Sequence, residues 1–215
     1  MFDIRNKLDN VKSALRDFRY NKRCRERLTN SEFTIISQNC MGGILYHRYN
    51  MQFKSPTINL FINPSDFIVF CENLHTYLTE GRLCFIECEK SYPVAKLKCQ
   101  NLKDILVYFM HYESIEEAEK KWYERSRRVN FNNIFFITSD LNLTYDEIQR
   151  FDRIQCSNKV VFTAREYSDI KSAFFLEKYK NEKYVGKFVN DINKSTGVRY
   201  VEEVFDFVAF FNCER

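Results

Sequence analysis

Apolar positions along the chain follow two different spacings, and their alternation predicts the fold class. Short apolar runs typical of buried strands occur at 33–37, 57–62, 82–89, 104–110, 133–140, 159–163 and 204–211. Stretches with the spacing of an amphipathic helix lie among them, at 63–78, 114–128, 144–152 and 168–193. Strands that alternate with helices are typical of an α/β fold. We therefore expect a three-layer α/β/α domain, with a mostly parallel sheet between layers of helices. Because 82–89 and 104–110 have no helix between them, we expect this sheet to be mixed.

The first 30 residues form a segment of their own. Its apolar residues step by four and three along one helical stripe, at Ile4, Leu8, Val11, Leu15 and Phe18. The segment holds nine of the 33 Lys and Arg residues but only four of the 29 Asp and Glu residues. We therefore divide the chain into a basic amphipathic helix at 1–30 and a single α/β domain at 31–215. Because the basic charge is confined to one helix, we do not expect nucleic-acid binding.

Attachment is the role that we expect for residues 1–28, since a contiguous apolar stripe is unfavourable in water. The stripe fits packing on the domain or on a second copy of the chain better than an anionic membrane surface, and the sequence leaves all three open.

Composition narrows the class of protein and its location. Apolar residues make up 45% of the chain and aromatic residues 16%, which is too hydrophobic for disorder. No apolar run approaches the length of a membrane span, and the charged N-terminus does not resemble a signal peptide. The eight cysteines form no C-x-x-C pair, so we expect reduced thiols, no disulfide and no structural metal. We also expect no cofactor. We expect a cytoplasmic protein, with a peripheral place on the inner face of the membrane left open.

A glycine pair indicates where a site could lie. Gly42 and Gly43 are two of only five glycines, and they follow the strand at 33–37 in the stretch S-Q-N-C-M-G-G. Ligands of open α/β sheets bind outside the carboxyl ends of the strands, and glycines at a helix start can present free amides to an anion. Asn39 and Cys40 would point into the same crevice. A tight turn without a ligand is the alternative interpretation.

Four further side chains fall near the same edge of the predicted sheet. His111 and Asp140 each follow a predicted strand, while Arg125 lies on the inner face of the helix at 114–128 and Arg128 less clearly so. Each also has a structural interpretation. His111 can continue a buried strand face, Asp140 can cap a helix or stabilise a turn, and Arg125 can form a salt bridge.

Several of these stretches, in the same order, resemble a known family. S-Q-N-C-M-G-G, S-P-T-I-N-L-F, H-Y-E-S and K-K-W-Y-E-R-S-R-R-V-N resemble the bacterial domain-of-unknown-function nineteen-nineteen family, whose members are commonly labelled exopolysaccharide biosynthesis proteins. The resemblance covers roughly residues 32–212. The segments that recur in the family match residues 39–43 and 111–128 of this chain. It implies a three-layer α/β/α domain and a link to surface polysaccharide assembly, without an agreed reaction.

Three functional hypotheses follow, and whether the chain is catalytic stays open among them. The first is a transferase that uses a nucleotide-sugar or a lipid-linked saccharide. Arg125 or Arg128 would bind its diphosphate, and His111 or Asp140 would act as base. The sequence contains no D-x-D triplet, so metal-dependent sugar transfer is not supported.

The second hypothesis is acyl transfer through Cys40, with His111 or His47 as its base. The third is a non-catalytic protein that binds a glycan or a biosynthetic partner.

Overall fold

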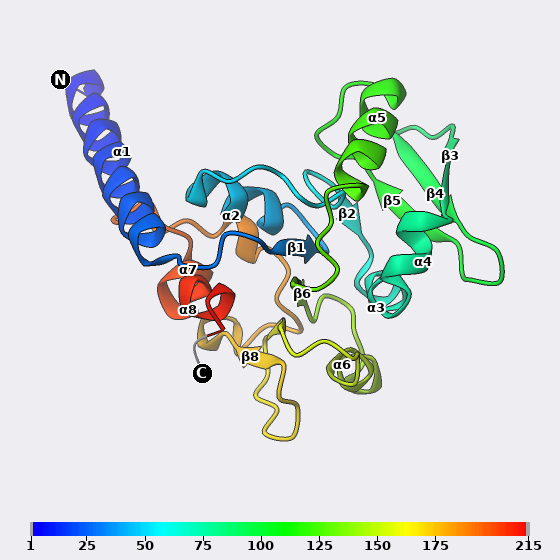
Figure 1. Ribbon diagram of the computed structural model, residues 1–215. Coiled ribbons are helices and arrows are strands. Elements are labelled where there is room, and N and C mark those ends of the chain that lie inside the picture. Colours follow the sequence, from blue (N-terminus) through cyan, green and yellow to red (C-terminus); the bar gives the residue numbers. More distant parts are fainter. Residues whose placement is uncertain (1, 214–215) are drawn as a thin grey trace.

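Four strands of the described chain form a parallel sheet (Figure 1). The computed structural model describes residues 2–213, and side chains from residue 15 onward. The strands are β1 (Thr34–Ser37), β6 (Ile134–Ser139), β7 (Lys159–Thr163) and β8 (Ala173–Phe175), in the order β1-β6-β7-β8. Ile36 lies opposite Phe136, and Ile137 lies opposite Val160. The strands expected at 33–37, 133–140 and 159–163 are therefore confirmed.

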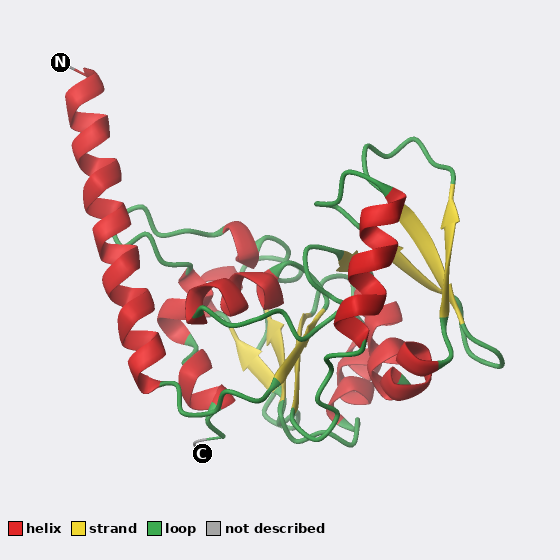
Figure 2. Ribbon diagram, turned by 45° about the horizontal axis from the view of Figure 1, so that its top comes forward, coloured by secondary structure: helices red, strands yellow, loops and turns green. Residues whose placement is uncertain are grey.

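A second sheet is antiparallel. Its strands are β2 (Phe61–Ile62), β5 (Ile105–Tyr108), β4 (Val94–Lys98) and β3 (Arg82–Ile86), in the order β2-β5-β4-β3. Figure 2 shows the strands in two separate groups. The α/β class is confirmed, but the strands that we expected in one mixed sheet are divided between two. The connections from β3 to β4 and from β4 to β5 are too short for a crossover, so these strands pair antiparallel.

Helices connect the strands and cover the sheets. They are α1 (Phe2–Arg27), α2 (Met41–Tyr49), α3 (Pro64–Glu72), α4 (Leu74–Thr79), α5 (Ile115–Ser126), α6 (Tyr145–Asp152), α7 (Tyr200–Val204) and α8 (Phe207–Phe211). Thr144 and Glu147 form a full capping box at α6, and Ser114 accepts a hydrogen bond from the amide of Glu117 at α5. The helix expected at 63–78 is interrupted at Asn73, whose side chain donates to the carbonyl oxygen of Val69 at 3.1 Å.

Two predictions for the last fifth of the chain are wrong. The segment 168–193 is not mainly helical, because it contains β8 and only two short 3-10 turns, η1 (Glu177–Tyr179) and η2 (Phe188–Asn190). The segment 204–211 is not a strand, because it contains the last residue of α7 and the whole of α8. A short apolar run fits a buried helix as well as a strand. Asp206 favours the helix here, because its carboxylate accepts hydrogen bonds from the amides of Val208 and Ala209, both at 3.1 Å.

The parallel sheet is buried on both faces. Side chains along β6 alternate between two hydrophobic clusters, with Phe135 on one face and Phe136 on the other. On the first face, Phe211 of α8 stacks on Phe33 with ring centroids 4.6 Å apart. The second cluster extends to the antiparallel sheet and includes Trp122 of α5. Burial on both faces explains why these strands read as continuous apolar runs.

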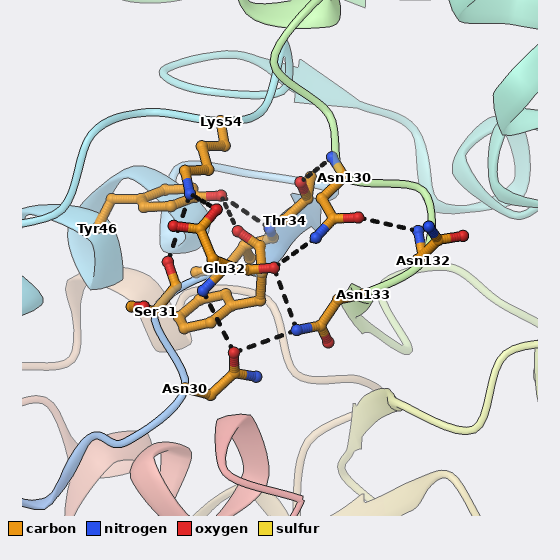
Figure 3. A network of polar contacts seen from close by, with 11 residues as sticks. Asn30, Ser31, Glu32, Thr34, Tyr46, Lys54, Asn130, Asn132 and Asn133 are labelled. Atoms are coloured by element: carbon orange, nitrogen blue, oxygen red, sulfur yellow. Dashed lines mark hydrogen bonds and ion pairs between the residues drawn. The ribbon is translucent and has the colours of Figure 1, made fainter.

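A network of polar side chains holds the amino ends of β1 and β6 together (Figure 3). Nδ2 of Asn130 donates to the carbonyl oxygen of Glu32 at 2.7 Å, and Nδ2 of Asn133 donates to the same oxygen at 3.2 Å. The amide of Asn130 donates to Oγ1 of Thr34 at 2.9 Å, and Nζ of Lys54 pairs with the Glu32 carboxylate at 2.6 Å. The network satisfies backbone groups at the end of the sheet opposite to the one that binds ligands in such folds.

Gly81 gives a direct test of packing at the end of α4. A Cβ at this position would lie 2.3 Å from the backbone oxygen of Tyr77, to which the Gly81 amide donates at 3.2 Å. We expect Gly81→Ala to lower the free energy of unfolding by about 1–3 kcal/mol, because the backbone must shift. Gly186→Ala is the matched control, since the nearest atom to its Cβ would be 3.5 Å away. Urea unfolding of both variants tests this, and equal stability would contradict it.

Helix α1 extends away from the two sheets and contacts the body near its C-terminal end (Figures 1 and 2). Oη of Tyr20 donates to the carbonyl oxygen of Glu202 at 3.0 Å, and Cys24 is buried. By contrast, Leu15 is 53% exposed and Phe18 is 60% exposed. In the part of the chain that the structure describes, no helix combines the length and the apolar character needed to cross a membrane.

Candidate functional site

A cavity of about 580 Å³ lies where the two sheets meet. The ends of β1 and β6 contribute residues from the parallel sheet, and β2 and the segment after β5 contribute residues from the antiparallel sheet. The lining consists of Gln38, Asn39, Cys40, Ile44, Asn59, Leu60, Phe61, Met110, His111, Ser139, Leu141, Gly186, Lys187, Val189 and Asn190. Its place at the carboxyl ends of β1 and β6 is the place where open α/β sheets bind ligands.

Three of the predicted site residues meet in this cavity. Asn39 and Cys40 follow β1, and His111 follows β5, so all three reach the lining from strand ends. Oδ1 of Asn39 also accepts a hydrogen bond from the amide of Met41 at 3.0 Å and so fixes the start of α2. Cys40 is the N-cap residue of α2, and burial raises the pKa of its thiol. The neutral thiol is therefore favoured over the thiolate that a nucleophile requires.

The glycine pair does not line the cavity but brings α2 close to its neighbours. A Cβ at Gly42 would lie 3.1 Å from Cβ of Ser37, and a Cβ at Gly43 would lie 3.1 Å from Oδ1 of Asn59. Both contacts are tighter than ordinary packing, so larger residues would push α2 away from β1 and from Asn59. The glycines thus position two parts of the lining, Cys40 on α2 and Asn59 on the facing segment.

Arg125 supports the cavity wall from behind. It is buried, and its Nη1 donates to Oη of Tyr112 at 2.6 Å. Oη of Tyr112 in turn donates to the carbonyl oxygen of Ile58 at 2.7 Å, directly before the lining residue Asn59. The guanidinium also lies over the ring of Phe53, 5.0 Å from its centroid.

The other two basic residues that we considered also lie outside the lining. Arg128 donates to the carbonyl oxygen of Phe53 at 3.4 Å, and His47 packs edge-on against the Phe53 ring. The cavity lining therefore does not include the three basic residues that we expected there, namely Arg125, Arg128 and His47.

Asp140 lies beneath the cavity and holds a segment of its wall. Its carboxylate accepts hydrogen bonds from the amides of Ala164 at 2.8 Å and Val185 at 2.6 Å. Burial raises the pKa of this carboxyl, and the two hydrogen bonds oppose the rise. The bond to Val185 anchors the segment 186–190, which contributes four lining residues. Asp140 thus acts on the site through the backbone and is a positioning residue.

Gln38 is a lining residue that the sequence reasoning missed. It is 1% exposed, its Oε1 accepts a hydrogen bond from Oγ1 of Thr138 at 3.3 Å, and its Nε2 has no hydrogen-bond partner. A buried donor without a partner is unfavourable, so this nitrogen is suited to a ligand atom. A polar residue directly after a buried apolar strand was the signal that could have identified it.

The polar part of the lining consists mainly of neutral hydrogen-bonding groups. Four residues carry side-chain amides, namely Gln38, Asn39, Asn59 and Asn190. Ser139 adds a hydroxyl, while His111 and Lys187 add nitrogen donors. The lining residues of this cavity include no Asp or Glu. Among all described residues, no three His, Cys, Asp or Glu side chains form a group that could hold a metal ion.

Comparison with known proteins identifies the family. The profile of the family described as "Domain of unknown function (DUF1919)" matches residues 11–212. The chain is also 36% identical over 211 residues to an uncharacterized protein of Haemophilus influenzae, and this alignment covers 96% of the chain and 98% of that protein. Both matches span both sheets and every lining residue of the cavity. The chain therefore belongs to the DUF1919 family, as the motifs around the glycine pair and along α5 had indicated.

Proposed function

We propose that the chain is a transferase of bacterial exopolysaccharide or capsule assembly, and that the cavity binds the saccharide phosphate of a nucleotide-sugar or a lipid-linked saccharide. One observation carries the proposal, namely that four side-chain amides line a single cavity at the carboxyl ends of β1 and β6. A sugar hydroxyl both donates and accepts a hydrogen bond, and each amide side chain offers both functions. Such a lining matches a polyhydroxylated ligand better than a purely anionic or purely apolar one.

The remaining lining residues suit the other parts of such a ligand. Phe61 and Met110 offer apolar surface to the C–H face of a sugar ring. Lys187 supplies a cation for a phosphate oxygen. Cys40 is the N-cap residue of α2, so the positive end of the helix dipole lies at the cavity. Nε2 of Gln38 supplies a further donor without a competing partner.

His111 is the lining residue best suited to act as base. In the proposed step, an acceptor hydroxyl oxygen attacks the anomeric carbon and the bond from that carbon to the phosphate oxygen breaks. The hydroxyl proton passes to the imidazole, and the phosphate or diphosphate leaves with the bonding electron pair. Acyl transfer through Cys40 is less favoured, because burial raises the pKa of this thiol. A lining without carboxylates also fits a protein that binds the saccharide without turnover.

We expect Lys187→Ala to weaken binding of a nucleotide-sugar about tenfold or more, because a charged hydrogen bond to phosphate is lost. Lys183→Ala is the matched control, since Lys183 is also exposed and lies outside the cavity lining. Isothermal titration calorimetry with a panel of nucleotide-sugars and saccharide diphosphates measures both. A ligand that binds both variants equally would place the site elsewhere, and binding without product release would support the non-catalytic alternative.

We also propose that the chain works peripherally at the inner face of the membrane. A lipid-linked substrate or product would be held in that bilayer, so a transferase that uses it must approach the lipid surface.

A further inference from the structure

We infer that the exposed face of α1 around Leu15 and Phe18 docks on an anionic lipid bilayer. The inference concerns a different surface from the cavity and does not depend on which ligand the cavity binds.

From residue 15 onward, α1 packs one face on the body of the protein and leaves the other face to solvent. Asp17, Tyr20 and Cys24 form the inner face: Asp17 accepts a hydrogen bond from Nη1 of Arg48 at 3.0 Å, and Cys24 is buried. With 3.6 residues per turn, Leu15 and Phe18 lie on a different side of the helix from these three residues. Their exposed fractions of 53% and 60% show that the body of the protein does not cover them.

The apolar spacing continues toward the start of the helix. Ile4, Leu8 and Val11 occur at the same steps of four and three that relate Leu15 to Phe18, and all five positions belong to α1. The structure thus resolves a question that the sequence left open, because the described part of this stripe does not pack against the domain. A solvent-exposed apolar stripe on a long helix indicates a surface for another molecule.

Basic residues surround the described part of the stripe. Arg16, Arg19 and Arg23 are exposed on this stretch of α1, and so is Lys22. The acidic residue between Arg16 and Phe18, Asp17, is already engaged, since it pairs with Arg48 on the inner side. A helix with an apolar stripe and flanking Lys and Arg side chains is the form that binds at the interface of an anionic bilayer.

The same charges disfavour binding of a second copy of the chain to this face of α1. In a two-stranded coiled coil, the residues that flank the apolar seam of one helix face those of its partner. In the heptad spacing of the sequence, the positions next to the apolar ones hold basic residues, namely Arg5, Lys7, Lys12 and Arg19. Pairing two such helices would bring like charges together, whereas an anionic surface attracts them.

Co-sedimentation of the full chain with lipid vesicles tests the inference. We expect binding to vesicles in which phosphatidylglycerol replaces about a third of the phosphatidylcholine, and much weaker binding to phosphatidylcholine alone. Phe18→Ser should weaken binding to the anionic vesicles about tenfold or more, because it removes the exposed aromatic side chain that would enter the bilayer interface. Arg16→Gln and Arg19→Gln should each weaken it about fivefold.

Matched controls come from α5. Ile115 is 45% exposed and Lys120 is exposed, so Ile115→Ser and Lys120→Gln remove the same kinds of group from another helix. Neither should change vesicle binding, and circular dichroism verifies that all variants are folded. Equal binding to neutral and anionic vesicles would overturn the inference, as would equal loss in Phe18→Ser and Ile115→Ser. A dimer that Phe18→Ser dissociates, without vesicle binding by the parent, would assign the surface to a second copy instead.

Discussion

Replacement of Glu202 by alanine is expected to lower the free energy of unfolding by about 3 kcal/mol or more, because it leaves the buried guanidinium of Arg48 without its main partner. The side chains of Arg48 and Glu202 are 5% and 1% exposed. Nη2 of Arg48 donates to Oε2 of Glu202 at 2.9 Å, and Nε of Arg48 pairs with the other carboxylate oxygen. Desolvation makes an unpaired charge at this depth far more costly than one at the surface.

The exposed pair of Glu72 and Arg150 provides the control. Arg150 donates to both carboxylate oxygens of Glu72, at 2.7 and 2.6 Å, but its side chain is 52% exposed. Glu72→Ala should therefore lower the free energy of unfolding by only about 0–1 kcal/mol. Replacing both buried partners, in Arg48→Met/Glu202→Leu, should recover most of the stability lost in Glu202→Ala. Urea unfolding of the three variants measures the differences, and a Glu202→Ala effect no larger than that of Glu72→Ala would show that the pair is not buried in solution.

The strength of the local signal decided how well the fold could be predicted. The strand at 159–163 and the helix at 144–152 were predicted correctly, because a continuous apolar run and a helical start such as Thr144 with Glu147 depend on neighbouring residues only. The segment at 204–211 was predicted wrongly, since a short run rich in Phe and Val can be buried as a helix or as a strand. Its structure depends on Asp206 and on the stacking of Phe211 on Phe33, which is far away in sequence.

The candidate site was predictable in its position but not in its full composition. Strand ends placed Asn39, Cys40 and His111 at one edge, and these three do share the cavity. The inner face of α5 indicated that Arg125 is buried, but not that Tyr112 intervenes between it and the cavity wall. Lys187 and Asn190 could not be found, because their segment carries no strand or helix pattern of its own. Tertiary contacts alone bring that segment to the sheet.

Asp140 holds the segment 186–190 at the parallel sheet. We expect Asp140→Ala to lower the free energy of unfolding by about 3 kcal/mol. Two buried amides, of Ala164 and Val185, lose their acceptor, and each such loss costs about 1–3 kcal/mol. Release of Val185 should also loosen the segment 186–190, so ligand binding in the cavity should weaken even under conditions where the variant is folded. Asp169→Ala is the control. Because Asp169 is exposed, this substitution should lower the free energy of unfolding by about 0.5 kcal/mol or less.

The dependence on pH distinguishes this role from simple packing. Burial raises the pKa of Asp140, so the folded chain holds this proton more tightly than the unfolded chain does. The contribution of Asp140 to stability should therefore fall as the pH rises from the ordinary range of a carboxyl group through its raised pKa. Asp140→Asn cannot titrate, so the stability of the parent relative to this variant should fall across that window. A stability difference that stays constant with pH, or one that grows in favour of the parent, would contradict the assignment of a desolvated carboxyl beneath the cavity.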